Sequence, residues 1–305
     1  MVRLENKYLA VETLHDEKRY PISALCHILK LNRSSYYKWR RRDQAEQEAK
    51  DKDLIAKMQA LHMEFKGILG YRRMQLYLSR RYGLRVNKKR VYRVMRAIGL
   101  QSVIRRRRPG YVKATPEAVA ENILGREFTA EKPNEKWLTD VTQFKASDGS
   151  RAYLSAILDL KDNHIVSYVV SRRNTCHLAD AVLDSAVRQN PGVKPLFHSD
   201  RGTHYTRKVF QDKLEALGMT QSMSRLGRCL DNSPIETLWS AIKTEMYYLS
   251  KFPDYISLET AIEQYIQFYN NGRYQVKLGG MAPLEFRKTL LALSSIPSPE
   301  KPTAR

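Results

Sequence analysis

Apolar residues recur at helical spacing through the first third of the chain, beginning with residues 22–29 and 34–41 in a segment that spans residues 1–45. A polar break separates the two stretches, and Asn32 or Ser34 can cap the second one. The arrangement predicts two short helices joined by a turn, as in a helix-turn-helix. Basic and aromatic residues occupy the exposed positions of the second helix. Helical hairpins of other function share this spacing, so the function of the segment stays open.

A second helical segment, residues 46–104, follows, with helices expected around residues 54–61, over 71–81 and over 87–98. The last of these has one apolar face, and basic residues fill its remaining positions. Asn87 can cap it. Such a helix suits the major groove of DNA or the phosphates beside it, whereas the alternative is an ordinary basic surface helix.

From residue 137 the pattern changes to alternation with a period of two and to short apolar stretches. Strands are expected over residues 137–144, 153–160 and 165–170, and their short connections predict an antiparallel meander. Helices and strands then alternate, which is typical of an α/β domain. The further expected elements are helices over residues 177–188, 206–217, 234–248 and 258–269 and strands over residues 195–198 and 219–223.

These patterns predict an α/β domain over residues 131–250, with a basic linker over residues 105–130 before it. The linker lacks periodicity and begins with four consecutive arginines, which can follow a phosphate backbone. Residues 251–305 form the last segment, in which one helix is followed by a proline-containing tail that supports the core.

The distribution of charged residues indicates a function for the helical part. The chain carries 53 Lys and Arg against 32 Asp and Glu, a net charge of +21. No acid occurs from Phe65 to Pro116, a stretch that holds sixteen of the bases. A solvated face normally mixes both signs, so this stretch favours binding to the phosphates of nucleic acid. The candidate DNA-contacting residues here are Arg72, Arg73, Lys88, Lys89, Arg90, Arg93, Arg105, Arg106, Arg107 and Arg108.

Other classes of protein are disfavoured by composition. The three cysteines are far apart and form no Cys-x-x-Cys pair, which fits a reducing cytoplasm and gives no zinc site at finger spacing. No apolar stretch approaches the ~18 residues that span a bilayer. We therefore expect a cytoplasmic protein without a membrane segment.

Three acids stand where rigid elements would hold them. Asp140 lies inside the first expected strand between apolar neighbours, where an unpaired charge is costly and requires a cation. Asp200 closes the fourth strand, and Gly202 would allow the backbone to turn sharply there. Glu236 falls in the first turn of a helix opened by residues 231–234, so a cap and an early proline would fix its position.

Carboxylates on separate rigid elements suit Mg²⁺ or Mn²⁺, and two such ions would clamp the attacking and leaving oxygens of a phosphoryl displacement. Lys243 lies two helical turns after Glu236, on the same face, and could hold a phosphate beside the metals. Each acid alone has an ordinary explanation, as a strand-edge residue, a turn former or a stabiliser of a helix N-terminus. Together with a basic helical half they favour a metal site.

Ordered motifs extend over nearly the whole chain. They comprise residues 70–73, 86–91, 122–128, 133–134, 137–142, 198–202, 222–224, 227–232 and 269–271, with Glu236, Lys243, Arg273 and Pro283. On these residues the sequence resembles the OrfB-type transposases of the bacterial "insertion sequence three" family, which belong to the retroviral-integrase superfamily of DDE transposases.

The resemblance implies an RNase H-like integrase catalytic core preceded by helical, helix-turn-helix-like DNA-binding domains. Asp140, Asp200 and Glu236 would be the catalytic residues that hold Mg²⁺ or Mn²⁺, while Lys243 and Arg201 would contact phosphates. The implied function is binding to the terminal inverted repeats of an insertion sequence, hydrolysis that exposes a 3′-hydroxyl, and strand transfer by that hydroxyl. Expected partners are double-stranded DNA, further copies of the chain on DNA and the upstream-frame (OrfA) product, in the bacterial cytoplasm at the nucleoid.

Two features depart from the family's pattern. Gln275 stands where many relatives have a histidine, which leaves the role of that loop open. The upstream frame that full-length family transposases carry is not evident before Met1, so the product acts with that partner or is the portion translated alone. Two rival hypotheses are a catalytically inactive DNA-binding regulator derived from a transposase and a general RNase H-like nuclease. The intact acids argue against the first, and the long basic region argues against the second.

Overall fold

The structure is a computed structural model, and it falls into two compact units, Met1–Glu64 and Phe65–Arg305, each of which is described by itself. The boundary between them lies inside the predicted helical segment 46–104. The predicted linker arginines, Arg105 to Arg108, lie outside the described residues. The described residues are 4–40, 44–104, 121–225 and 229–294.

The first unit is helical, as the apolar pattern predicts. Its core contains residues of α1, α2 and α3, and Tyr36 of α3 is fully buried in it. Asn32 caps α3, because its side-chain oxygen accepts a hydrogen bond from the Ser34 amide at 2.9 Å. The structure adds α1, which has no apolar face long enough to be visible in the sequence and buries only Tyr8 and Val11. The helices are α1 (Leu4–Lys18), α2 (Ile22–Ile28), α3 (Arg33–Arg40) and α4 (Gln44–Glu64).

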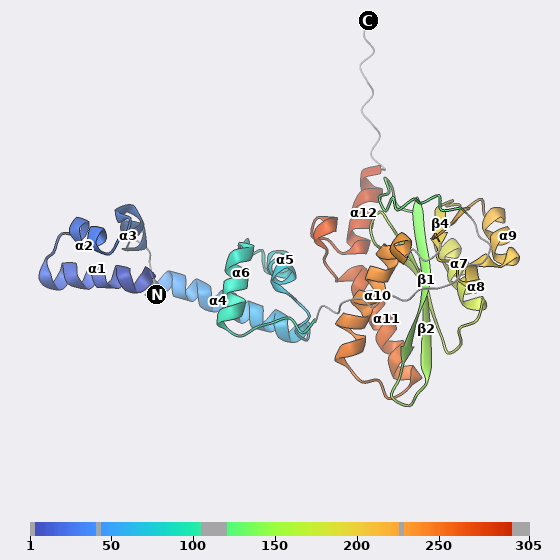
Figure 1. Ribbon diagram of the computed structural model, residues 1–305, viewed down its shortest axis with the longest axis horizontal. Coiled ribbons are helices and arrows are strands. Elements are labelled where there is room, and N and C mark those ends of the chain that lie inside the picture. Colours follow the sequence, from blue (N-terminus) through green and yellow to red (C-terminus); the bar gives the residue numbers. More distant parts are fainter. Residues whose placement is uncertain (1–3, 41–43, 105–120, 226–228, 295–305) are drawn as a thin grey trace, which may run out of the picture. The chain divides into compact units, whose positions relative to one another are not determined.

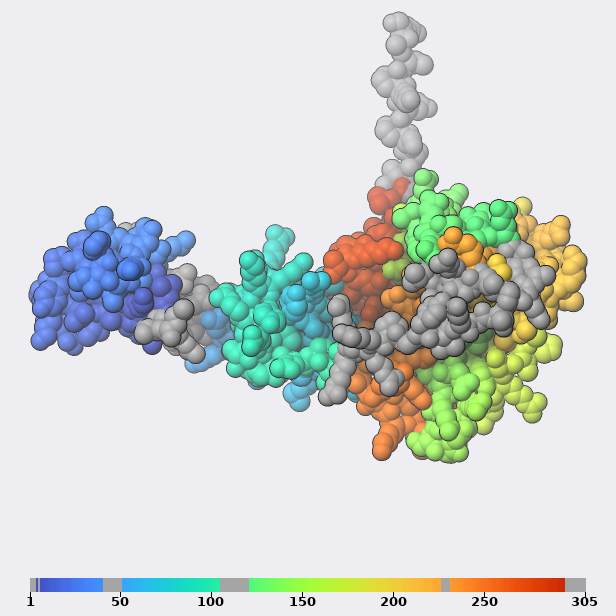
Figure 2. Space-filling model, viewed as in Figure 1, coloured from blue at the N-terminus to red at the C-terminus, as the bar shows by residue number. Residues whose placement is uncertain are grey.

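The second unit begins with α5 (Tyr71–Tyr82) and α6 (Lys88–Ala97), close to the predicted bounds. Gly83 ends α5 in the left-handed conformation, with a φ of 66°, which glycine adopts without steric cost. Asn87 caps α6 as predicted, accepting from the Lys89 amide at 2.8 Å. The two helices lie at the surface of the molecule (Figure 2).

A five-stranded sheet with the order β3-β2-β1-β4-β5 forms the centre of the second unit (Figure 1). β1, β2 and β3 pair antiparallel, which confirms the predicted meander, while β4 lies parallel to both β1 and β5. The strands are β1 (Lys136–Lys145), β2 (Arg151–Asp159), β3 (Ile165–Ser171), β4 (Leu196–Ser199) and β5 (Thr220–Met223).

Helices cover both faces of the sheet. The helices α7 (His177–Gln189), α8 (Thr203–Thr206) and α9 (Lys208–Ala216) lie on one side, and α10 (Ser233–Glu245) and α11 (Tyr255–Asn271) lie on the other (Figure 1). One apolar core lies under each layer of helices, and α11 contributes six buried residues to the core that it shares with α10. The remaining elements are three short 3-10 helices, η1 (Cys229–Asn232), η2 (Tyr247–Leu249) and η3 (Val276–Leu278), and the helix α12 (Pro283–Ser294).

Some predicted elements differ from the structure. The predicted helix 206–217 is α9, which begins at Lys208; the structure adds the short helix α8 before it, separated by the extended backbone of Arg207. The predicted tail contains a helix that the sequence pattern did not predict, α12, whose first residue is Pro283; proline is favoured at the start of a helix. Residues 121–130 have no helix or strand, yet Leu124 is buried in the core, so this end of the predicted linker is packed.

The helix α5 packs against the loop that follows α11. The Tyr77 hydroxyl donates to the Gly272 carbonyl at 2.7 Å, and the Tyr77 and Tyr274 rings lie 4.8 Å apart. Arg73 of α5 lies 3.0 Å from the Glu245 carboxylate at the end of α10. These contacts tie the basic helical part to the helix that carries Glu236.

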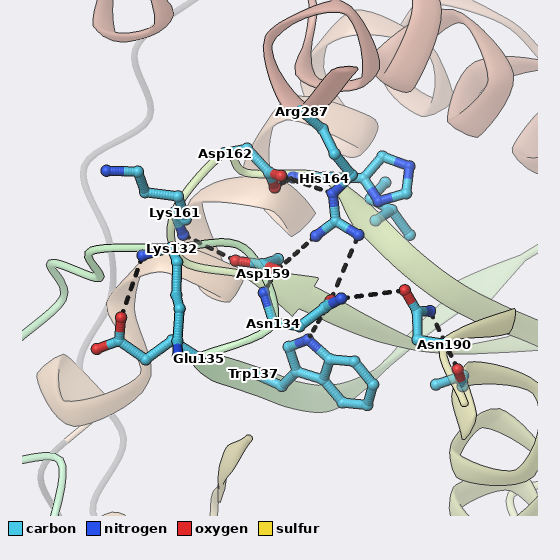
Figure 3. A network of polar contacts seen from close by, with 12 residues as sticks. Lys132, Asn134, Glu135, Trp137, Asp159, Lys161, Asp162, His164, Asn190 and Arg287 are labelled. Carbon is cyan, nitrogen blue, oxygen red and sulfur yellow. Dashed lines mark hydrogen bonds and ion pairs between the residues drawn. The ribbon is translucent and has the colours of Figure 1, made fainter. Parts of the chain in front are cut away.

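A buried polar network fixes the start of β1 to the end of β2 and to α12 (Figure 3). Arg287 donates to Asp159 at 2.5 Å and to Asp162 at 2.6 Å, and all three side chains are buried. The Asn134 amide also donates to Asp159, and the Trp137 ring nitrogen donates to the Asn134 side chain. The network therefore holds one end of the strand that carries Asp140.

Among the described residues, no helix is both long enough and apolar enough to cross a membrane.

Candidate active site

Strand alternation decides which way Asp140 points. Leu138 packs in the core beneath α10 and α11, whereas Trp137 packs beneath α7 and α9. Asp140, two residues after Leu138, therefore points toward α10. The parallel ladder between β1 and β4 ends at the pair Leu138 and His198, so both Asp140 and Asp200 lie just beyond the point where these strands stop sharing hydrogen bonds.

Asp200 follows β4 directly, as predicted, and its Oδ1 accepts from the Gly202 amide at 2.9 Å. The predicted reason for Gly202 was wrong: its φ of −64° and ψ of 151° are ordinary for any residue. A Cβ there would instead lie 2.9 Å from Asp200 Oδ1. Glycine at this position leaves room for the Asp200 carboxylate.

Glu236 lies in the first turn of α10, with Pro234 just before it. The predicted cap is not a side-chain cap, because Asn232 makes no such hydrogen bond at the helix start. The side-chain amide of Asn232 donates instead to the backbone carbonyl of Thr139 at 3.3 Å, next to Asp140 on β1. The start of α10 is thereby attached to the strand that carries the first acid.

A pocket of about 290 Å³ opens over the two aspartates. Its lining is largely polar and comes from β1, β2, the loop before α7 and the segment after β4. The lining includes Asp140, Gln143, Tyr153, Asn174, Asp200 and His204. Glu236 is exposed and does not line this pocket.

The Asp200 carboxylate destabilises the charge of Asp140. The pKa of Asp140 is raised to about 7, chiefly by burial, then by the nearby Asp200 carboxylate, with a smaller repulsion from Glu236. Burial also raises the pKa of Asp200. Neither aspartate forms an ion pair with a residue that the structure describes, and an enclosed anionic pair of this kind is stabilised by a bound cation.

Two residues of α10 approach Asp140. The Trp239 ring nitrogen donates to Asp140 Oδ2 at 2.8 Å, which opposes the rise in pKa. Lys243, one further turn along, is half-buried, and its Nζ lies 5.7 Å from the centroid of the Phe144 ring. Burial lowers the pKa of Lys243, while the attraction of Asp140 opposes this shift. The predicted shared face of Glu236 and Lys243 therefore also carries Trp239.

The structure brings the predicted acids together in part. Asp140 and Asp200 share one pocket, and Glu236 lies close enough to affect the pKa of Asp140. Within the described ranges, no group of three or more His, Cys, Asp and Glu side chains is close enough to hold one metal ion. The donor set of two enclosed carboxylates fits a divalent cation, which prefers oxygen ligands, and the third carboxylate lies beside them.

The segment behind Asp200 is fixed by a buried histidine. His198 Nδ1 lies 2.9 Å from the Ser222 hydroxyl oxygen, and Nε2 lies 3.2 Å from that of Ser224. Burial lowers the pKa of His198 to about 4, so the ring is neutral at neutral pH. These contacts join β4 to β5 immediately before Asp200.

Asp231 fixes the approach to α10. Its carboxylate is fully buried and accepts from Arg225 and Arg126, with Nε to oxygen distances of 2.9 and 2.5 Å. Asn122 is a third residue that donates to it, at 2.9 Å. The hydrogen bonds from Arg225 are the main reason that the pKa of Asp231 lies below its usual range.

Two predicted DNA contacts are occupied inside the protein. Arg73 donates to the Ile68 carbonyl at 3.0 Å and pairs with Glu245, a carboxylate that it shares with Arg273. Arg201 donates through Nε to the Ser224 carbonyl at 2.6 Å. In this conformation each side chain uses at least one donor to hold a protein segment. By contrast, the exposed predicted residues include Arg72, Lys88, Lys89 and Arg93.

Sequence reasoning missed several residues at the site. Trp239, three residues after Glu236 and four before Lys243, lies on one helix face with both, and that spacing was a usable signal. His204 and Asn174 line the pocket from segments whose convergence depends on the sheet order, which no local pattern reveals. Their positions required the tertiary structure.

The fold and the acids define a class. The integrase core domain family matches residues 130–229, a second integrase core family matches residues 236–291, and a helix-turn-helix-like domain family matches residues 48–108. The mixed sheet, with acids on β1, after β4 and on α10, is thus the integrase-type core of a polynucleotidyl transferase, and the protein is an enzyme of that class.

Relatives narrow the class to a family. A putative transposase InsK of element IS150 from Escherichia coli K12 is 36% identical over 270 residues, which cover 88% of this chain and 94% of the relative. The InsF transposase of IS3A from the same organism is 29% identical and is covered completely. The chain belongs to the OrfB-type transposases of the "insertion sequence three" family. Among solved structures, the HTLV-2 integrase catalytic core in complex with magnesium covers 52% of this chain at 19% identity, with a TM-score of 0.42.

Proposed function

We propose that this transposase binds the terminal inverted repeats of an insertion sequence, cuts DNA to expose a 3′-hydroxyl and transfers that strand end to target DNA. One observation carries the proposal. Asp140 and Asp200 face one pocket and form no ion pair with any residue that the structure describes, while Glu236, Trp239 and Lys243 lie beside them on α10. Two enclosed carboxylates that form no ion pair with a described residue are costly to folding, and they are typical of a site that uses a ligand cation.

Asp140, Asp200 and Glu236 would hold Mg²⁺ or Mn²⁺, as two ions. A bound divalent ion supplies Lewis acidity at the phosphate and at the attacking oxygen. The protein supplies position: Gly202 leaves space for the Asp200 carboxylate, and Trp239 orients that of Asp140. Lys243, half-buried beside Asp140, would contact a DNA phosphate.

DNA would be gripped outside the pocket by the basic helical part. Arg72, Lys88, Lys89 and Arg93 are exposed on α5 and α6, in a stretch without acids. The predicted contacts of Arg90 and of the linker arginines 105–108 remain proposals of the same kind. Further partners would be other copies of the chain assembled on DNA and the OrfA product, at the bacterial nucleoid.

The test uses purified full-length chain and duplexes copied from the ends of the DNA that surrounds its gene. We expect Mg²⁺-dependent nicking and joining by the native chain. Glu236→Gln and Asp200→Asn should each lower the joining rate by at least about a thousandfold, the scale of losing electrostatic stabilisation of a transition state. Binding to the same duplexes without Mg²⁺ should be unchanged.

Asp212→Asn is the matched control, because Asp212 is an exposed acid on α9 that pairs with Lys208. This variant should join DNA at the native rate. Undiminished joining by Glu236→Gln would refute the assignment of that residue. Tight repeat binding with no Mg²⁺-dependent nicking would instead support a DNA-binding regulator, and cutting without any joining would support a general nuclease.

A further inference from the structure

A second pocket, with a volume of about 580 Å³, lies where α5, α6 and η3 meet. It shares no lining residue with the pocket that contains Asp140 and Asp200. This volume is within the ~300–1,000 Å³ of pockets that bind small molecules. The lining combines two tyrosines, three basic residues and one aliphatic residue, without an acid. It consists of Tyr71, Arg72, Lys88, Lys89, Tyr92 and Val276.

The two tyrosines give the pocket an aromatic wall. Tyr71 begins α5, and its ring lies 5.3 Å from that of Tyr92 on α6, at an interplanar angle of 64°. Tyr92 is 46% exposed, so a large apolar ring faces solvent inside a concave site. Arg72 donates to the Tyr71 hydroxyl at 3.1 Å, which keeps its guanidinium next to the aromatic wall.

The basic residues surround this wall. Lys88 and Lys89 are exposed in the first turn of α6, which contains no acid. The backbone amides of this turn add a partial positive charge, and Asn87 uses its side chain to cap one of them. The pocket therefore offers the exposed ring of Tyr92, with Tyr71 beside it, and several positive donors within a few residues of one another.

We infer that this pocket binds one unpaired nucleotide of a DNA strand, with the base against Tyr92 and Tyr71 and the phosphate held by Lys88, Lys89 and Arg72. The inference rests on the proposed function, since it assumes a DNA substrate. Paired bases hide their faces inside the duplex, so an aromatic wall has no partner on intact DNA. Phosphates alone need no aromatic rings.

The experiment compares two duplexes of the same sequence, one blunt and one with a short unpaired extension that carries 2-aminopurine. Binding to the full-length chain is measured by fluorescence anisotropy in EDTA, so that no cutting occurs. The extended duplex should bind on the order of tenfold more tightly, which is the typical effect of stacking one base on an aromatic side chain. The 2-aminopurine emission should fall on binding, because stacking quenches it.

Tyr92→Ala should remove both the preference and the quenching while leaving blunt-duplex affinity within about twofold of native, since it removes the stacking surface and no charge. Tyr92→Phe should retain both. Tyr82→Ala is the matched control, because Tyr82 is an exposed tyrosine at the end of α5 that does not line the pocket. Lys88→Ala should weaken both duplexes and lower the salt dependence by roughly one phosphate contact.

Equal binding of the two duplexes by the native chain would overturn the inference. So would a Tyr92→Ala variant that weakens both duplexes alike, which would mean that the wall contacts ordinary duplex. Metal-dependent joining is assayed separately. A native chain that prefers the extension but never joins DNA would overturn the proposed function and leave the pocket assignment intact, while joining without any preference would do the reverse.

Discussion

Acidic side chains of the second unit occur in two kinds of surroundings. Asp231 and Glu245 are buried, and each is held by two arginines. The hydrogen bonds of Arg225 lower the pKa of Asp231, and Arg273 with Arg73 lowers that of Glu245 against the effect of burial.

Asp140 and Asp200 are enclosed as well, yet no described cation pairs with them, and burial together with repulsion by Asp200 raises the pKa of Asp140 to about 7. Asp159 is intermediate: burial and its neighbour Asp162 raise its pKa to about 6, although Arg287 contacts both. The comparison teaches that arginine partners mark the acids that stabilise the fold, whereas an enclosed acid without one is available to a ligand.

The largest expected effect comes from removing the one arginine shared by two buried acids. Arg287→Met would leave Asp159 and Asp162 buried without a cation, which should lower the free energy of unfolding by about 3–5 kcal/mol. Urea denaturation measures the loss. Lys288→Met, at the exposed neighbouring position, should change stability by less than about 0.5 kcal/mol. Equal stability of the two variants would remove the structural role assigned to this network.

A sharper comparison uses the neighbouring residues Arg73 and Arg72. Arg73→Met should lower the free energy of unfolding by about 1–3 kcal/mol, because Glu245 loses one of its arginines. Its salt dependence of DNA binding should stay native. Arg72→Met should show the opposite pattern, with native stability and a salt dependence lower by about one phosphate contact. If Arg73→Met left stability unchanged and reduced the salt dependence, the result would support the prediction that Arg73 contacts DNA.

Asp140→Asn should stabilise the metal-free protein by about 1–2 kcal/mol at neutral pH while abolishing joining. The pKa of Asp140 is raised in the folded state, so the folded state binds the extra proton and stability falls as pH rises from about 4 to about 7. The difference between the variant and the native chain should therefore be near zero at pH ~4 and largest above pH ~7. Thermal unfolding in EDTA across that range measures it, and a difference independent of pH would contradict the assignment.

The smallest expected effect is at Trp239. Trp239→Phe removes the hydrogen bond that favours the ionised form of Asp140, so the pKa of Asp140 should rise. The acidic limb of the joining rate should move to higher pH by roughly half to one unit, with little loss at the optimum. Trp239→His, which can still donate, should leave the limb closer to its native position. An unmoved limb for Trp239→Phe would show that this hydrogen bond does not tune Asp140.

Local patterns were sufficient for the regular elements. The meander of β1 to β3 and the helices α2, α3, α5, α6 and α7 lie within a few residues of their predicted bounds, because their apolar residues follow the period of the element. The same patterns missed α1, which buries only two side chains, and α12, which begins at Pro283.

The acids themselves were also accessible from the sequence, because Asp140 interrupts an apolar strand and Asp200 ends one. The contacts that fix the residues around these acids could not be predicted from the sequence. Arg73 pairs with Glu245, and the Asn232 side chain donates to the Thr139 carbonyl. Both contacts follow from packing between residues far apart in the chain. Charge composition predicts that a base is available, and only the structure shows whether another side chain already occupies it.

A single substitution at Gly202 would inactivate the copy of the element that carries it. One added methyl group there would leave the backbone angles undisturbed and push aside the Asp200 carboxylate, which lies 2.9 Å from the position it would take. The surface of α5 and α6 would be untouched, so under the proposed function the altered copy would still bind the element's ends. Copies of this kind would compete with active ones for the same sites, and a single substitution could thereby restrain the spread of the whole element within its host.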